Sequence, residues 1–445
     1  MKSLIRILLV FLISTSNSIA CGWYPFDEDV RFSLIDPSIF DDGGMSPYYY
    51  TSKNYGYQFV STPENDPNIE LWKTYCNGEV DAKSIYEAIY ILELGEFQKK
   101  GSSNKMISYL RQNDKEALAY IAFAKTCSDF NQVNTGWERE DGDTFERHEK
   151  MLAALKISKG VKSEIIKKRY RFLAIRLAYY NGDEKKVNEI YKKSFSDNPK
   201  DAIDYWALYF KSTTEEMSAN RNFNLAQVFV NAPGKRFGAL SRFSKGIPID
   251  EVLAFANTNT ERANVYVMYA VRHRGRGFST LKKVQELDPN HPLLDFLLIR
   301  EVNKLEDWIL TPRYTNFEPT IDVRRESYGE SNELIQERIK DDEKYGREVA
   351  KWMETLNIAS DNATWYIAGA YLKGITGSEK EALGMLSDCT GNAQGLIKRL
   401  IILFGVRDNV EKSLTREQEN ILMDSNQENY NLFLFAVSRE YEFQK

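Results

Sequence analysis

The residue types that most often carry catalysis or bind metals are scarce in this chain of 445 residues, which has only three histidines and four cysteines. His148, His273 and His291 form no HExxH pattern, and no two of them are spaced as ligands on one helix face. His291 stands between Asn290 and Pro292, a composition typical of a turn between helices. The chain also lacks the GxSxG elbow of serine hydrolases and the phosphate-binding P-loop. We therefore expect no catalytic, metal-binding or cofactor-binding residue.

Paired carboxylates are the remaining route to catalysis, and two acidic runs lie close to tryptophans. Asp27-Glu28-Asp29 follows Trp23, and Glu138-Arg139-Glu140-Asp141 follows Trp137. A glycan-cleaving enzyme needs two carboxylates about 5–10 Å apart on either side of the sugar. Because the chain contains 64 acidic residues, neighbouring acids are expected by chance. A glycan-acting helical toroid is therefore only a third interpretation.

The amino terminus has the pattern of an export signal over residues 1–20. Lys2 and Arg6 precede an unbroken apolar run from Ile7 to Ile13, and the small residues Ser18 and Ala20 suit cleavage before Cys21. The apolar run is far shorter than the roughly 20 residues needed to cross a bilayer. We expect an exported protein that does not span the membrane.

Cys21 is a candidate lipidation site, because the leader resembles that of bacterial lipoproteins. Ser18 stands where such leaders usually have leucine. The alternative is that Cys21 is simply the first residue after cleavage. The lipoprotein interpretation implies a location in the periplasm or at the outer membrane of a bacterium, with a lipid anchor as the only contact with the membrane.

The other three cysteines have no CxxC or similar spacing, which excludes the common zinc and iron–sulfur patterns. Cys76 and Cys127 are a candidate disulfide in an oxidising periplasm. The alternative is that they and Cys389 are small buried hydrophobic residues.

Charge argues against nucleic acid as a partner. Removing the leader takes two of the 59 basic residues and none of the 64 acidic ones, so the net charge of −5 becomes 57 − 64 = −7. The one local basic patch is Arg272, Arg274 and Arg276, with Lys235-Arg236 and Arg242 as a candidate extension. We interpret the patch as a solvated turn, with anionic lipid headgroups or an acidic partner as the alternative.

Residues 21–68 form an irregular, aromatic-rich segment. Five prolines interrupt it and Tyr48-Tyr49-Tyr50 lies within it. Such rings are costly to leave in water, so we expect the segment to pack along a helical body. An aromatic platform for a sugar or peptide is the alternative.

Helical periodicity dominates the rest of the chain and predicts an all-α fold. We expect a helical repeat region over residues 69–310, an irregular connection over 311–330 and a C-terminal helical region over 331–445. In the last of these, residues 429–443 are apolar on more than one face. We expect this terminal helix to need a partner, a second copy or a continuation of the chain, with cover by the aromatic amino-terminal segment as the alternative.

Internal similarity predicts stacked antiparallel helical hairpins. Gly182, Val187, Tyr191 and Pro199 keep the intervals of a turn glycine, two apolar positions and a closing proline. A second unit repeats the first intervals from Gly377, and a weaker third ends near Pro289. These units resemble the tetratricopeptide repeat, which implies a solenoid that binds a partner on its concave surface.

Taken together, the sequence predicts a non-enzymatic cell-envelope protein, a helical-repeat scaffold for an unidentified protein partner or ligand. A glycan-binding lipoprotein of a polysaccharide-uptake system is the second interpretation. Exposure of Trp23, Trp137 or Trp206 on one face would favour it.

Overall fold

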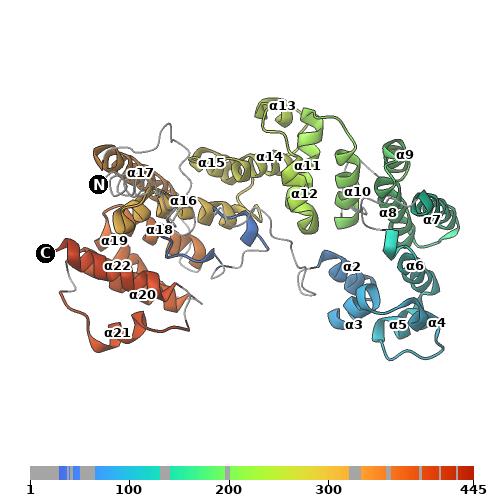
Figure 1. The fold of residues 1–445 in the computed structure, drawn as a ribbon, viewed down its shortest axis with the longest axis horizontal. Coiled ribbons are helices and arrows are strands. Elements are labelled where there is room, and N and C mark those ends of the chain that lie inside the picture. The colour runs from blue at the N-terminus through green and yellow to red at the C-terminus, as the bar shows by residue number, and fades with distance from the viewer. Residues whose placement is uncertain are drawn as a thin grey trace, which may run out of the picture. The chain divides into compact units, whose positions relative to one another are not determined.

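The computed structural model describes residues 30–37, 40, 44–50, 66–130, 141–195, 201–319, 332–356, 362–389, 393–409, 412–426 and 429–445. These residues form 21 α-helices and contain no β-strand (Figure 1). The all-α prediction is therefore confirmed. The chain divides into two compact units: unit 1 is Met1–Ile39, Tyr50–Tyr55 and Val302–Lys445, and unit 2 is Phe40–Tyr49 and Gly56–Glu301.

Unit 2 contains most of the helices. They are α2 (Pro67–Tyr75), α3 (Ala82–Tyr86), α4 (Leu94–Gln98), α5 (Lys105–Asn113), α6 (Lys115–Lys125), α7 (Asp141–Gly160), α8 (Glu164–Tyr180), α9 (Glu184–Ser194), α10 (Ala202–Thr213), α11 (Ala219–Asn231), α12 (Arg236–Arg242), α13 (Ile249–Leu253), α14 (Asn259–Arg272) and α15 (Phe278–Leu287). Short turns of other helix types are η3 (Ser46–Tyr48), the π-helical η5 (Glu87–Ile91), η6 (Ser128–Phe130) and η7 (Pro233–Lys235).

The boundary between the units falls inside α16 (Leu294–Thr315). The further helices of unit 1 are α17 (Asn332–Glu354), α18 (Ala363–Ile375), α19 (Glu379–Asp388), α20 (Gln394–Arg407), α21 (Arg416–Leu422) and α22 (Tyr430–Phe443).

The three predicted turns do connect pairs of packed helices. Gly182 has φ +74° and lies between α8 and α9, and Gly377 has φ +93° and lies between α18 and α19. Glycine adopts this left-handed conformation without the clash that a Cβ would cause. The Ser163 side chain caps α8 by accepting from the Ile166 amide, and the Asp183 side chain caps α9 in the same way. The α14–α15 pair is joined by residues 273–277, and the predicted closing residue Pro199 lies outside the described residues.

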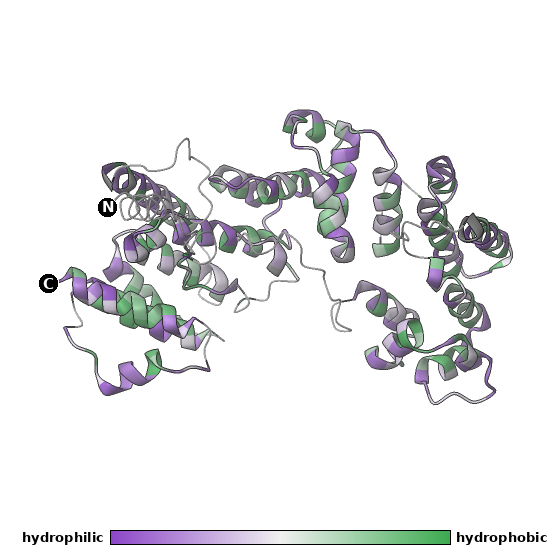
Figure 2. Cartoon of the chain, in the orientation of Figure 1, coloured by the Kyte–Doolittle hydropathy of each residue, from purple (hydrophilic) through white to green (hydrophobic). Residues whose placement is uncertain are grey.

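Hydrophobic and hydrophilic residues are mixed along the helices (Figure 2), and the buried faces are mainly apolar. Helix α16 also buries the charged residues Glu301, Lys304, Glu306 and Asp307. In unit 2, α7 packs on α8, α8 on α9 and α10, α10 on α11, and α11 on α12 and α14. In unit 1, α17, α18, α19 and α20 pack in sequence, and α22 packs on α20 and α21.

The aromatic-rich segment is largely buried where it is described. Tyr48, Tyr49 and Tyr50 are at most 6% exposed. In unit 2, the rings of Tyr48 and Tyr49 lie edge-on to Phe229 and Phe296. In unit 1, the Trp308 indole donates to the Tyr50 hydroxyl at 3.0 Å. These three rings therefore fill the interior and leave no open aromatic surface.

The buried carboxylate of Glu306 fastens residues 33–35 to α16 in unit 1. It accepts from the backbone amides of Leu34 and Ile35 at 2.7 and 2.9 Å and from the Ser33 hydroxyl at 2.9 Å. Asn303 and the Tyr371 hydroxyl donate to the same carboxylate at 2.9 and 2.7 Å. Five donors from three parts of the chain therefore meet at one side chain.

Helix α16 extends further than the sequence indicated. It continues through Pro312 to Thr315, into the segment expected to be irregular. The Thr315 hydroxyl donates to the Thr311 carbonyl, and the Thr311 hydroxyl donates to Asp307 at 2.9 Å. These side-chain contacts support the last turn, where proline supplies no N–H.

Helix α22 buries one face within unit 1. Phe433, Ala436 and Val437 are buried, whereas Phe435 and Phe443 are 44% and 46% exposed. The expectation that the apolar residues of this helix need an external cover therefore does not apply to its buried face, which packs against α20 and α21.

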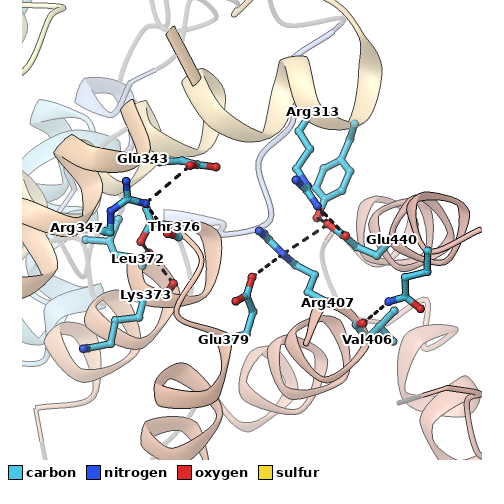
Figure 3. A network of polar contacts seen from close by, with 12 residues as sticks. Arg313, Glu343, Arg347, Leu372, Lys373, Thr376, Glu379, Val406, Arg407 and Glu440 are labelled. Atoms are coloured by element: carbon cyan, nitrogen blue, oxygen red, sulfur yellow. Dashed lines mark hydrogen bonds and ion pairs between the residues drawn. The ribbon is translucent and has the colours of Figure 1, made fainter. Parts of the chain in front are cut away.

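Charged contacts fix the far end of α22 (Figure 3). Glu440, only 3% exposed, accepts two hydrogen bonds from Arg313 at 3.0 and 2.9 Å and one from the Tyr314 hydroxyl at 2.7 Å. Arg407 lies between Glu440 and Glu379, with its Nε 3.6 and 3.3 Å from their oxygens.

Candidate functional site

The predicted cysteine sites are not assembled in the described part of the chain. Cys21 lies outside the described residues. The disulfide predicted between Cys76 and Cys127 is not formed, because both are buried free thiols, as is Cys389. Cys76 follows α2 and is fully covered, and burial raises the pKa of its thiol to about 11. The contacts of Cys76 are those of a small hydrophobic residue, which was the alternative interpretation.

The predicted basic patch occupies the end of α14 and its connection to α15. Arg274 and Arg276 are exposed and Arg272 is half-buried. Of the candidate extension, Arg236 and Lys235 do not join them as surface charge, whereas Arg242 is exposed at the end of α12. Arg236 is buried and donates to the Phe229 carbonyl at 3.1 Å, while Lys235 turns into the cavity described below.

His291 has the role of a buried neutral side chain. It is 3% exposed, its Nδ1 accepts from the Leu293 amide at 3.1 Å, and its Nε2 lies 2.8 Å from Asn264 Oδ1. Because Nδ1 accepts, the proton belongs on Nε2, which donates to Asn264. The Asn264 amide donates in turn to Gln227 at 2.6 Å, and burial lowers the pKa of His291 to about 4. This hydrogen-bond chain ties the 291 turn to α14 and α11.

Unit 2 contains a cavity of about 770 Å³, which we call the unit 2 cavity. Its volume is that of a site for a small organic ligand. Its walls come from α2, η5, α4, α6, η6, α8, α10 and η7, so segments far apart in the sequence form one pocket. The principal lining side chains are Asn68, Trp72, Tyr90, Glu93, Tyr120, Lys125, Arg169, Phe172, Arg176, Trp206 and Lys235.

Three of these side chains form what we call the cationic cluster: Arg169, Arg176 and Lys235. Arg169 and Arg176 lie seven residues apart on α8, about two turns, and therefore on one face of the helix. The Tyr120 hydroxyl is within electrostatic range of both guanidinium groups, and Arg176 and Lys235 repel each other. Arg176 therefore lies within electrostatic range of Lys235, and Arg169 lines the same cavity.

Arg169 is the most deeply buried member of the cluster, at 4% exposure. Its guanidinium carbon lies 4.1 Å from the centre of the Trp72 ring, and its Nη1 donates to Asn68 Oδ1 at 2.8 Å. Its Nε and Nη2 have no hydrogen-bond partner among the described residues. Burial lowers the pKa of the guanidinium, and among the described residues no carboxylate lies within 4.0 Å to offset its charge.

Lys235 and Arg176 are held by aromatic rings rather than by acids. Lys235 Nζ lies 5.1 Å from the centre of Phe210 and 5.5 Å from that of Tyr209, and the Arg176 guanidinium lies 5.9 Å from that of Phe172. Burial, with a smaller contribution from Arg176, lowers the pKa of Lys235 to about 8. Cation–π contacts compensate a desolvated charge only in part.

Two carboxylates also line the unit 2 cavity, but they do not neutralise the cluster. Asp66 caps α2 by accepting from the Asn68 amide at 2.8 Å, and it accepts from the Tyr90 hydroxyl at 2.6 Å. Glu93 interacts electrostatically with Lys125. With four cationic and two anionic side chains in the lining, the formal charge is 4 − 2 = +2. The cavity is suited to bind a negative group.

Sequence reasoning missed this site, although part of its signal was visible. From the sequence, Lys235 is a candidate extension of the basic patch, whereas the structure places it in the cavity lining. Trp206 is a candidate glycan-binding aromatic residue from the sequence, and it lines the same cavity. The seven-residue spacing of Arg169 and Arg176 among aromatic residues of one predicted helix could have indicated the charged face.

Comparison with known protein families, with curated proteins and with solved structures finds no match for this chain. None of the described helices combines the length and apolar character needed to cross a bilayer. Over the same residues, no three His, Cys, Asp or Glu side chains are grouped as metal ligands. The case for function therefore depends on the geometry of the cavity itself.

Proposed function

We propose that this chain is an exported, non-enzymatic binding protein of a bacterial cell envelope, and that the unit 2 cavity is its ligand site. The observation that carries the proposal is the cavity, to which eight helical elements contribute and which aromatic and cationic side chains line. The export pattern over residues 1–20 and Cys21 supports the location. Hairpins resembling tetratricopeptide repeats supply the scaffold, since stacked helices form concave walls without needing a catalytic centre.

The test is recovery of a ligand that depends on the cavity. The mature protein is immobilised, exposed to a cell-envelope extract and washed, and the small molecules released on denaturation are identified by mass spectrometry. The matched control is Ala124→Trp, which places a large side chain on the α6 wall of the cavity. Compounds retained by the wild type and not by the variant support the proposal. Identical profiles from two folded proteins would exclude the cavity as the site.

Glycan binding is the second candidate, and the aromatic rings of the cavity favour it. Trp206 is half-buried and Tyr90 is 46% exposed, and both line the cavity. Ring faces of this kind are apolar surfaces on which sugar rings can pack. A glycan array probed with the wild type and with Trp206→Ala tests this candidate, and array signals equal for the two proteins would refute a role for Trp206.

A further inference from the structure

The cationic cluster contrasts with Lys168, a neighbouring cation of α8 that two carboxylates balance. Lys168, next to Arg169 in the sequence, lies 2.8 and 3.0 Å from carboxylate oxygens of Asp201 and Asp204. Arg169, Arg176 and Lys235 have no such contact within 4.0 Å among the described residues. Arg169 is buried and Arg176 and Lys235 are half-buried, and a desolvated charge without a counter-charge is costly. An anion in the adjoining cavity would offset that cost.

Aromatic rings lie directly beside the cluster. Trp206 and Phe172 have ring centres 5.6 Å apart, and Phe172 lies 6.0 Å from Phe210, the ring beneath Lys235. The guanidinium of Arg176 lies over Phe172. One wall of the cavity therefore combines a positive region with a continuous apolar surface.

We propose that the unit 2 cavity binds a small organic anion, whose acidic group contacts Arg176 and Lys235 and whose ring packs against Trp206 and Phe172. Arg169 acts as a positioning charge behind them, since its own Nε and Nη2 are covered by protein. This inference rests on the proposed function and specifies its ligand class: a ring compound that carries a carboxylate, sulfate or phosphate.

Isothermal titration at low ionic strength tests the ligand class with four probes. Benzoate and glucuronate are ring anions, and benzamide and glucose are their neutral counterparts. We expect one-to-one binding of at least one anion and at least tenfold weaker binding of its neutral counterpart. Equal affinity for the neutral and charged probes, or no binding of either anion at 10 mM, overturns the inference.

Three variants locate the charge that matters. Arg176→Gln and Lys235→Gln should each weaken anion binding at least tenfold, because each removes a positive charge that lines the cavity. Lys185→Gln is the matched control, since Lys185 is exposed on α9 and does not line the cavity. It should change affinity less than twofold. If all three variants weakened anion binding equally, affinity would depend on the net charge of the protein. That result would overturn the assignment of Arg176 and Lys235 as the anion contacts.

Proton uptake provides an independent readout. At pH 8 the empty site holds Lys235 about half protonated, and a bound anion favours the protonated form. Arg176 is the charged neighbour that opposes this protonation, and Arg242 lies over the same Tyr209 ring. Binding at pH 8 should take up roughly half a proton, measured from the enthalpy in buffers of different ionisation enthalpy. Lys235→Gln should abolish the uptake, and an uptake unchanged in that variant refutes direct contact.

Failure of this inference is distinguishable from failure of the proposed function. If extract compounds depend on an open cavity but are neutral, the binding function holds and the anion class is wrong. If the wild type and Ala124→Trp retain the same compounds, the cavity is not the ligand site and both fail.

Discussion

His291 should make the stability of unit 2 depend on pH. Its pKa is about 4 in the folded chain and about 6.5 in an unfolded one. Below pH 6.5 the unfolded chain takes up a proton that the folded chain refuses until the pH approaches 4. The contribution of His291 to the free energy of unfolding is therefore fully present above pH 6.5 and is lost as the pH falls toward 4. At about 1.36 kcal/mol per pH unit, the loss from this side chain is roughly 3 kcal/mol.

His291→Asn is the perturbation, because asparagine does not titrate and its side-chain oxygen can still accept from the Leu293 amide. The variant loses the contact with Asn264 and should be less stable than the wild type at pH 7 by about 1–3 kcal/mol. Its free energy of unfolding should not show the decrease at low pH that protonation of His291 causes in the wild type. The difference between the two proteins should therefore shrink by roughly 3 kcal/mol between pH 7 and pH 4 and can change sign.

Urea unfolding followed by circular dichroism at pH 7, 6, 5 and 4.2 measures this difference. Gln227→Leu is the matched control, since Gln227 belongs to the same hydrogen-bond chain but does not titrate. Because Gln227 lies in unit 2, the unfolding transition that shifts in this variant is the transition of unit 2. The free energy of unfolding of this control should differ from that of the wild type by the same amount at all four pH values. A His291→Asn curve that also runs parallel would refute the argument that His291 is buried in the neutral form.

Three further predictions concern packing, the buried carboxylate and the leader. Gly374→Ala should cost about 1–3 kcal/mol in urea unfolding, because the added Cβ meets the Phe404 ring. Gly384→Ala, which has open space in α19, should instead raise stability by up to about 1 kcal/mol. Glu306→Gln should speed hydrogen exchange at the two amides of residues 34 and 35, because an amide cannot accept from all five donors; unchanged protection would contradict this. Cys21→Ser should abolish alkyne-palmitate labelling in cells, and equal labelling of wild type and variant would exclude a lipid anchor at Cys21.

The hairpins could be predicted because their signals are local. Gly182 is visible as a turn residue, and the apolar residues after it keep a helical period, so the pair α8 and α9 follows from a short stretch of sequence. The same holds for the glycine at Gly377. Local signals did not predict where α16 ends. The helix continues past Pro312, and hydrogen bonds from the neighbouring threonine side chains accompany this additional turn.

The cavity could not be predicted because its signal is not local. Lys168 and Arg169 are consecutive basic residues, yet one pairs with two carboxylates and the other faces an aromatic ring and the cavity. A rotation of about 100° per residue separates their directions, and only the packing of α8 against α10 decides which direction carries acids. Lys235 joins the same site from a turn much later in the chain.

Arg313 and Arg169 show two different surroundings of a desolvated guanidinium, and the difference bears on the cavity. In unit 1, burial opposes the charge of Arg313, but hydrogen bonds from Arg313 to Glu440 outweigh burial and raise its pKa. Arg407 lies within reach of Glu440 and Glu379 (Figure 3). Among the described residues no carboxylate lies within 4.0 Å of Arg169, and burial lowers its pKa. Because Arg169 also lines the cavity, an anionic ligand is the counter-charge that our proposal expects there.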